Sequence, residues 1–259
     1  MEPTEIVVLE WTFSPPDYFE DRIDLNRDDY EMVIDRGKVE ARITPEVYDT
    51  IPSTRDDLHF ALNDRFLGVQ LLTHKPYELS KASMYRLHPD GRKDITVFVE
   101  PLVVTLSLGA PDIIVKDKDG NVISDSRKDR IEKKKELADL AETYRRIDPT
   151  TASLLKSYQA AVNDPNNELV HLFEIRDAVS KKFGGKSAAR DALKISSTQW
   201  SRFGHLANDE PLKQGRHRGK SPGTLRDATE TELMEARNIA RRLVEAYLEY
   251  LELMSAGPA

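Results

Sequence analysis

The chain contains 259 residues, of which 39% are hydrophobic and 32% are charged, and its formal net charge is −7. This length accommodates one large domain or two ordinary ones, and the apolar segments between the charges are not typical of a disordered chain. The chain has no cysteine, which excludes disulfide bonds, thiolate catalysis, and zinc or iron–sulfur sites with cysteine ligands.

The N-terminus and the apolar runs bear on localisation. Residues 1–5 are acidic where a secretory signal peptide would be basic. No apolar run approaches the roughly 18 residues that a membrane-spanning helix requires. We therefore expect a soluble cytoplasmic protein that has no membrane partner.

The charges are distributed unevenly along the chain. Residues 1–128 contain 16 lysines and arginines against 25 aspartates and glutamates, whereas residues 129–259 contain 22 against 20. Much of the acid lies within residues 17–31, which we expect to form a solvated loop. An acidic surface repels phosphates, so a nucleic-acid partner should contact the C-terminal half.

The N-terminal half has the two-residue period of strands. Residues 7–13 alternate between apolar and polar positions and predict a strand, and the alternating runs on either side of Asp35–Gly37 predict a hairpin. A long helix is expected from Ser53, a candidate N-cap, to residue 72. Further strands are expected at residues 85–87, 95–99, 103–108, 113–115 and 122–124. The pattern predicts an α+β domain over residues 1–125, with one long helix against a mostly antiparallel sheet.

The period becomes helical from residue 129 onward. Helices are expected at residues 131–147, 154–162, 169–183, 188–193, 198–206 and 229–254. The last and longest of them opens with a capping box, Thr229-x-x-Glu232. These elements predict an all-α helical bundle over residues 126–259, so the fold class of the chain is α+β.

Metal and nucleotide sites have little support in the sequence. Residues 117–121 open like a calcium loop, but the glycine and glutamate that such a loop needs are replaced by Val122 and Lys128, so we expect a hairpin turn. His171 and Glu174 have the spacing of a metal-binding pair, but no second such pair occurs in the other helices, which favours a polar helix face. No glycine-rich nucleotide motif occurs. We expect neither a metal nor a cofactor.

Residues 189–202 resemble the helix-turn-helix of repressor proteins. A first helix ends in Ala192-Leu193, and a turn with Ile195-Ser196 leads to a second helix. Arg190, Lys194 and Trp200 stand where that motif usually has a small residue, a turn glycine and a small aliphatic residue. The resemblance implies a DNA-binding regulator; the alternative is an ordinary helix pair. The residues that would face the major groove are Ser197, Thr198, Gln199 and Arg202.

The loop before the last helix is basic and contains no acid. Its cations are Lys213, Arg216, Arg218, Lys220 and Arg226. They predict contacts with phosphates, and the alternative is a solvated basic loop. The cations on either side of His217 favour the neutral imidazole that a general base requires.

The order of these elements over residues 130–254 resembles the HEPN family of small helical bundles. The resemblance implies RNA as a partner, and many members are metal-independent ribonucleases or their inactive relatives. That family has an arginine and a histidine separated by four to six residues near the start of the last helix, and this spacing is absent here. The candidate catalytic residues are instead His217 and Arg216, which lie in the basic loop before the last helix. A non-catalytic interaction or scaffold protein, including a homo-oligomer, is the hypothesis from a different class.

Overall fold

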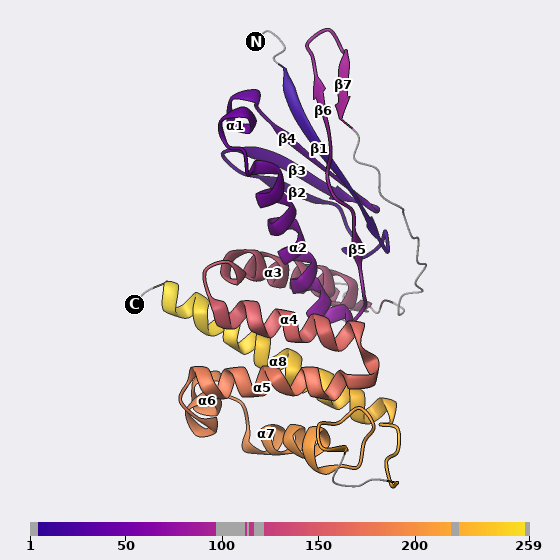
Figure 1. Cartoon of the computed structure of the whole chain (residues 1–259), viewed down its shortest axis with the longest axis vertical. Coiled ribbons are helices and arrows are strands. Elements are labelled where there is room, and N and C mark those ends of the chain that lie inside the picture. The colour runs from indigo at the N-terminus through magenta and orange to yellow at the C-terminus, as the bar shows by residue number, and fades with distance from the viewer. Residues whose placement is uncertain (1–4, 97–111, 113, 117–121, 219–222, 257–259) are drawn as a thin grey trace. The chain divides into compact units, whose positions relative to one another are not determined.

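A computed structural model describes residues 5–96, 112, 114–116, 122–218 and 223–256 (Figure 1). The chain divides into two compact units, which are Met1–Val69 with Tyr77–Glu136 and Gln70–Pro76 with Leu137–Ala259. Helices α2 (Thr54–Thr73) and α3 (Ser126–Arg145) each contribute residues to both units. The antiparallel sheet of the first unit and the helices of the second confirm the α+β class. The expected strand at 103–108 and turn at 117–121 lie outside the described residues.

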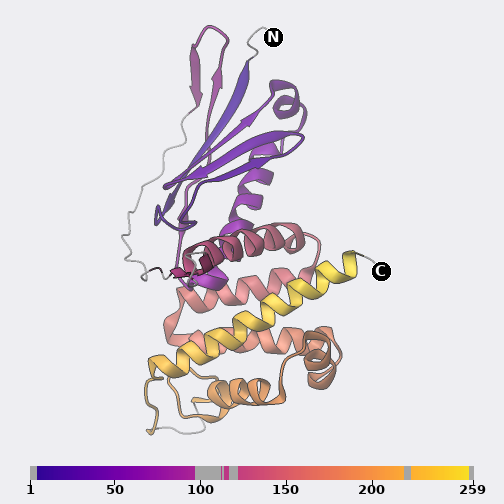
Figure 2. The same ribbon diagram turned by 180° about the vertical axis from the view of Figure 1, so that it is seen from behind.

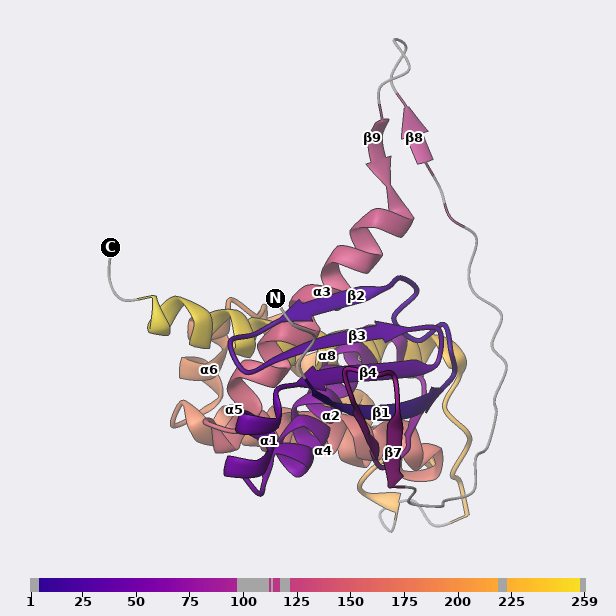
Figure 3. The same cartoon turned by 90° about the horizontal axis from the view of Figure 1, so that it is seen from above.

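The first unit, called the sheet unit below, is built on antiparallel strands (Figure 3). They run in the order β2-β3-β4-β1-β6-β7, and a short strand β5 also pairs with β1. Their bounds are β1 Ile6–Ser14, β2 Ile23–Asn26, β3 Tyr30–Asp35, β4 Lys38–Ile43, β5 Glu78–Leu79, β6 Ser83–Leu87 and β7 Lys93–Thr96. A separate hairpin consists of β8 (Ile114–Lys116) and β9 (Val122–Asp125), and a short helix α1 (Pro45–Thr50) follows β4.

One face of this sheet is apolar because alternate residues of each strand point the same way. In β1, Leu9 pairs with Ala41 of β4 on one side and with Met84 of β6 on the other. Helix α2 contributes Phe66 to this core, and its ring lies 5.2 Å from that of Phe13. The predicted long helix and the β3–β4 hairpin are therefore confirmed.

The acidic segment 17–31 is not a solvated loop, so that expectation is wrong. Residues 23–26 form the edge strand β2, where Ile23 and Leu25 are buried. Tyr18 and Phe19 are also buried, and the hydroxyl of Tyr18 donates to the carbonyl of Phe66 at 3.3 Å. Most of the acidic residues of the segment are exposed, although Glu20 is partly buried, so the carboxylates lie largely outside a segment that packs on the core.

In the second unit, called the helical unit below, helix α8 lies across the other helices (Figure 2). Its other elements are α4 Pro149–Asn163, η1 Pro165–Asn167, α5 Glu168–Lys182, α6 Lys186–Leu193, α7 Ser197–Gly204 and the π-helical turn η2 His205–Asp209. Helix α8 (Glu230–Ser255) packs against α4, α5, α6 and α7, and it buries Leu243, Val244 and Tyr247. No helix among the described residues is long and apolar enough to cross a membrane.

A buried ionic network joins α5 to α8 within the helical unit. Glu168 is only 1% exposed, and its carboxylate accepts two hydrogen bonds from Arg237, at 2.6 and 2.9 Å. His74 approaches the same carboxylate at 3.4 Å. Burial alone would raise the pKa of Glu168, but the hydrogen bonds from Arg237 and His74 lower it. The carboxylate is therefore kept ionised in an apolar setting.

Candidate nucleic-acid interface

Helices α6 and α7 are joined by a tight turn whose geometry has a local cause. Lys194 ends α6 in the left-handed region, at φ 53°, which reverses the chain direction. Ser196 then caps α7, since its hydroxyl accepts from the backbone N–H of Gln199 at 3.2 Å. The Gln199 side chain in turn accepts from the backbone N–H of Ser196 at 3.3 Å, which completes a capping box.

The buried faces of the two helices pack on their neighbours in the helical unit, α6 on α5 and α8, and α7 on α8. The buried residues are Ala189, Leu193, Ile195, Trp200 and Phe203. Trp200, which replaces the small aliphatic residue of repressor motifs, is only 4% exposed. The larger side chain is accommodated because it packs beneath Arg176 of α5, whose guanidinium carbon lies 4.9 Å from the indole ring.

The outer face of α7 is polar, and its first turn is open to solvent. Ser197, Thr198 and Gln199 are exposed, as is Ser201 one turn later. Arg202 is less available, because its guanidinium donates to Glu235 of α8 at 2.9 Å. Three of the four residues expected to face a groove are therefore exposed on the first turn of α7, whereas Arg202 is already paired with Glu235.

Most described cations of the basic loop are paired with carboxylates. Lys213 contacts Asp227 at 2.8 Å, Arg226 contacts Glu232 at 2.7 Å, and Arg216 contacts Asp177 at 3.3 Å. Arg218 instead donates to neutral oxygens, including the side chain of Asn167 and the carbonyl of Gly215 at 2.9 Å. Lys220 lies outside the described residues. The loop therefore offers less unpaired positive charge than its composition suggests.

His217 is exposed, and its ring lies against the π-helical turn. The Nδ1 atom is 3.3 Å from the carbonyl oxygen of Asn208, so this nitrogen carries a proton if the contact is a hydrogen bond. The backbone N–H of neighbouring Arg216 donates to the carbonyl of Ala207 at 2.8 Å, which fixes the loop against the same turn. Among the residues that the structure describes, no carboxylate lies within ion-pair distance of His217.

Two residues that sequence reasoning missed, Phe173 and Arg176 of α5, lie beside this loop. The guanidinium carbon of Arg176 is 4.8 Å from the Phe173 ring, and that of Arg216 is 4.3 Å from the same ring. Burial lowers the pKa of Arg176, and the charge of Arg216 lowers it further, although Asp177 opposes this change. The three-residue spacing of Phe173 and Arg176 was the one available signal.

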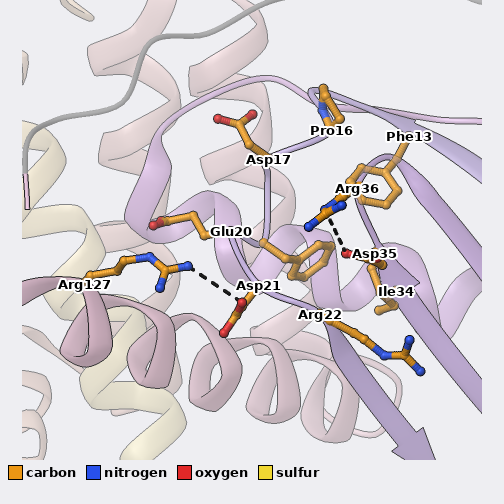
Figure 4. Close-up of a pocket in the computed structure, with 11 residues that line it drawn as sticks. Phe13, Pro16, Asp17, Glu20, Asp21, Arg22, Ile34, Asp35, Arg36 and Arg127 are labelled. Atoms are coloured by element: carbon orange, nitrogen blue, oxygen red, sulfur yellow. Dashed lines mark ion pairs between the residues drawn. The ribbon is translucent and has the colours of Figure 1, made fainter.

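A hollow of about 620 Å³ lies in the sheet unit (Figure 4). Its apolar lining includes Phe13, Phe19 and Ile34, which belong to the core. Carboxylates and guanidinium groups alternate around them, and the ion pairs are long, at 3.7 Å for Arg127 with Asp21 and 3.9 Å for Arg36 with Asp35. This mixture of charges favours neither an anionic nor a cationic ligand.

The pair His171 and Glu174 does not extend into a metal site. His171 contacts Asp164 at 3.2 Å, and Glu174 accepts a hydrogen bond from Ser157 at 3.0 Å. Among the described residues, no group of three histidines, aspartates or glutamates is arranged to hold a metal ion.

The helical unit thus carries two surfaces of interest, the exposed first turn of α7 and the arginines beside Phe173. The first of them lies in a basic segment, because residues 181–204 contain six lysines and arginines against the single acid Asp191. Comparison with known protein families, with curated proteins and with solved structures finds no match to this chain.

Proposed function

We propose that the helical unit binds double-stranded DNA, with the first turn of α7 in the major groove. The observation that carries this proposal is the exposed and capped start of α7, which follows α6 through a turn in the left-handed region at Lys194. In helix-turn-helix proteins, the N-terminal residues of the second helix contact base edges.

The side chains at this position suit the acceptors and donors of the major groove. The hydroxyls of Ser197 and Thr198 can both donate and accept hydrogen bonds. Gln199 uses its oxygen in the capping box, which leaves its amide nitrogen to donate to an acceptor such as guanine N7 or O6. Lys186 and Lys194 are exposed on the same helix pair and can contact phosphates.

The basic loop supports a second candidate, contact with RNA through Arg218 and His217. Arg218 is bound to neutral oxygens, and among the described residues His217 has no acidic partner. The same loop would contain the catalytic residues of the metal-independent ribonuclease that the HEPN resemblance implies. The pairing of Lys213, Arg216 and Arg226 with carboxylates makes this candidate the weaker of the two.

The test is selection of preferred duplexes from a random pool, followed by fluorescence anisotropy at several salt concentrations. Thr198→Ala should lower the preference for the selected sequence by about 1–3 kcal/mol per lost base contact, because base contacts carry specificity. Arg242→Gln is the control, since Arg242 is exposed on α8 and forms a long contact of 3.4 Å with Glu249.

Two outcomes would contradict the DNA proposal. One is the absence of duplex binding by the wild type at low salt, and the other is an unchanged sequence preference in Thr198→Ala. Tighter binding of single-stranded RNA than of any duplex would favour the loop instead.

A further inference from the structure

The guanidinium group of Arg176 is held by two aromatic rings of the helical unit. Its central carbon lies 4.8 Å from the ring of Phe173 and 4.9 Å from the ring of Trp200. A guanidinium that lies over aromatic faces keeps its N–H bonds in its own plane, where they remain free to donate. The rings thus restrict the position of this cation without using its hydrogen-bond donors.

These donors have no acceptor within the part of the chain that the structure describes. Arg176 forms neither a hydrogen bond nor an ion pair there, although an arginine carries five N–H donors. Other half-buried arginines of the same unit do have partners: Arg237 donates to Glu168 and Arg202 donates to Glu235. No nitrogen of Arg176 is among the fully buried unpaired atoms of the described residues, so a bound anion can reach these donors.

A second guanidinium lies at the same ring. The central carbon of Arg216 is 4.3 Å from the Phe173 ring, and the backbone N–H of Arg216 is anchored on Ala207 at 2.8 Å. The two like charges are close enough for Arg216 to lower the pKa of Arg176. Their repulsion would be relieved by an anion that binds both.

The adjacent helix leaves room for this arrangement. A Cβ placed on Gly204 of α7 would overlap the Nη1 atom of Arg176, so the absence of a side chain admits the guanidinium. The buried indole N–H of Trp200 has no acceptor among the described residues either, but it is enclosed and is not counted among the donors that a ligand could reach. The region therefore combines a restrained cation, a second cation and unused donors.

We propose that Arg176 and Arg216 together form a binding site for a phosphoryl group. The ligand class follows from the donors, because planar guanidinium groups bind phosphate oxygens through paired hydrogen bonds and match a charge greater than one. Two sources share this chemistry: a phosphodiester of nucleic acid, and a free phosphate, pyrophosphate or nucleotide. The site lies outside α6 and involves no base-reading residue of α7, so it stands apart from the DNA proposal.

Asp177 is the group that such a ligand must displace. Its carboxylate lies 3.3 Å from Nη1 of Arg216, and its side chain is 56% exposed. A phosphoryl group with more charge and more acceptors can replace this single contact and also reach Arg176. Removal of the Asp177 charge should consequently strengthen anion binding, a sign that a merely structural role of Arg216 would not give.

The experiment measures binding of the full chain to pyrophosphate by calorimetry and to a duplex and a single-stranded DNA by anisotropy. Arg176→Gln and Arg216→Gln should each weaken binding about tenfold or more, because each removes charge-assisted hydrogen bonds. Asp177→Asn should tighten binding several-fold, and the control Arg242→Gln should leave it unchanged. Circular dichroism confirms that each variant is folded.

Gly204→Ala supplies a variant that retains every charge. The added methyl group should displace the Arg176 guanidinium and weaken binding in the same direction as Arg176→Gln. This variant remains informative if the charge-removing substitutions of Arg176 or Arg216 fail to fold.

The two sources of phosphate give different results. If the site binds a phosphodiester, Arg176→Gln should lower the slope of log affinity against log salt by about one for either strand form, with the sequence preference unchanged. If it binds a free phosphoryl compound, only pyrophosphate affinity should fall.

Failure of the DNA proposal would show instead as an unaltered sequence preference in Thr198→Ala. Equal affinities of wild type, Arg176→Gln and Arg216→Gln in every arm, or no binding by the wild type in any arm, would overturn the site.

Discussion

Glu20 is a carboxylate whose ionisation holds α3 against the sheet within the sheet unit. It occupies the left-handed region, at φ 69°, and accepts hydrogen bonds from Arg130 at 2.8 Å and from Lys134. Burial alone would raise the pKa of Glu20, but the hydrogen bonds from these two cations lower it to about 2. Lys134 differs, because burial lowers its pKa more than the pairing with Glu20 raises it.

This depressed pKa predicts a pH dependence of stability with a defined sign. The ordinary pKa of the carboxyl is 4.5, so its stabilising contribution is complete above that value and is lost as the pH falls from about 4.5 toward 2. Unfolding in urea at pH 7 and pH 3 should therefore show a smaller pH effect for Glu20→Gln than for wild type, by about 1–2 kcal/mol once solvent screening of the partly exposed carboxylate is allowed for. The exposed Glu46 provides the control, Glu46→Gln. Equal pH effects in wild type and Glu20→Gln would refute this role.

The sequence predicted that the loop before α8 is basic, but it did not predict which of the cations form ion pairs. The run of lysines and arginines was visible, but the carboxylates that neutralise Lys213 and Arg216 lie 14 and 39 positions away along the chain. Arg176 could not be predicted for the same reason, because Trp200 belongs to another helix and approaches only in the folded chain. Side chains distant in sequence decide which cations remain free.

Among the elements, the turn between α6 and α7 stores backbone strain at Lys194. The left-handed conformation of a residue with a Cβ is about 1–2 kcal/mol less favourable in free energy, whereas glycine adopts it without that penalty. The strain persists because both flanking helices are fixed, α6 by buried Leu193 and α7 by the capping box at Ser196.

Lys194→Gly should accordingly stabilise the chain by about 0.5–1 kcal/mol, after part of the relieved strain is offset by the greater freedom of glycine in the unfolded state. Lys194→Val should destabilise it, because a β-branched side chain is still less tolerant of positive φ. Urea unfolding monitored by circular dichroism measures both. A Gly variant less stable than wild type would indicate that the Lys194 side chain contributes contacts that outweigh the strain.

Hydrophobic periodicity predicted the long helices and strands, whereas it did not predict the short or irregular elements. The α2 and α8 helices and the β3–β4 hairpin have long runs of one period. By contrast, β2 has four residues inside an acidic run. In the π-helical turn at residues 205–209, each backbone hydrogen bond spans one residue more than in an α-helix, a difference that no apolar pattern of that length can reveal.

At the scale of the whole chain, the division into units does not follow a single cut. Residues Gln70–Pro76 belong to the helical unit although the first four of them are the last residues of helix α2. The carbonyl of Leu71 accepts from the hydroxyl of Tyr158 at 3.1 Å, and His74 approaches buried Glu168 at 3.4 Å. The boundary expected between residues 125 and 126 stays a prediction about independent folding. A C-terminal fragment cut at that boundary would lack Leu71 and His74 and therefore these contacts.

A fragment of residues 126–259 should consequently be helical but less stable than the helical unit of the full chain. The fragment leaves the Tyr158 hydroxyl and one side of the Glu168 carboxylate without partners, and each unmade buried contact costs about 1–3 kcal/mol. Thermal unfolding by circular dichroism makes the comparison, and His74→Ala in the full chain should reproduce part of the loss. A fragment that unfolds at the same temperature as the full chain would contradict this expectation.

Strand β2 ends the sheet on one side, within the part of the chain that the structure describes. An uncovered edge offers its backbone N–H and C=O groups to the strand of another molecule, which is a common start of aggregation. Here the outward positions are Asp24 and Asn26, and Asp24 forms a 2.7 Å ion pair with exposed Arg22. A strand added by a second molecule would have to lie alongside this charge pair. We therefore expect the acidity of the segment to oppose growth of the sheet from molecule to molecule, and hence the formation of fibrils in a concentrated solution.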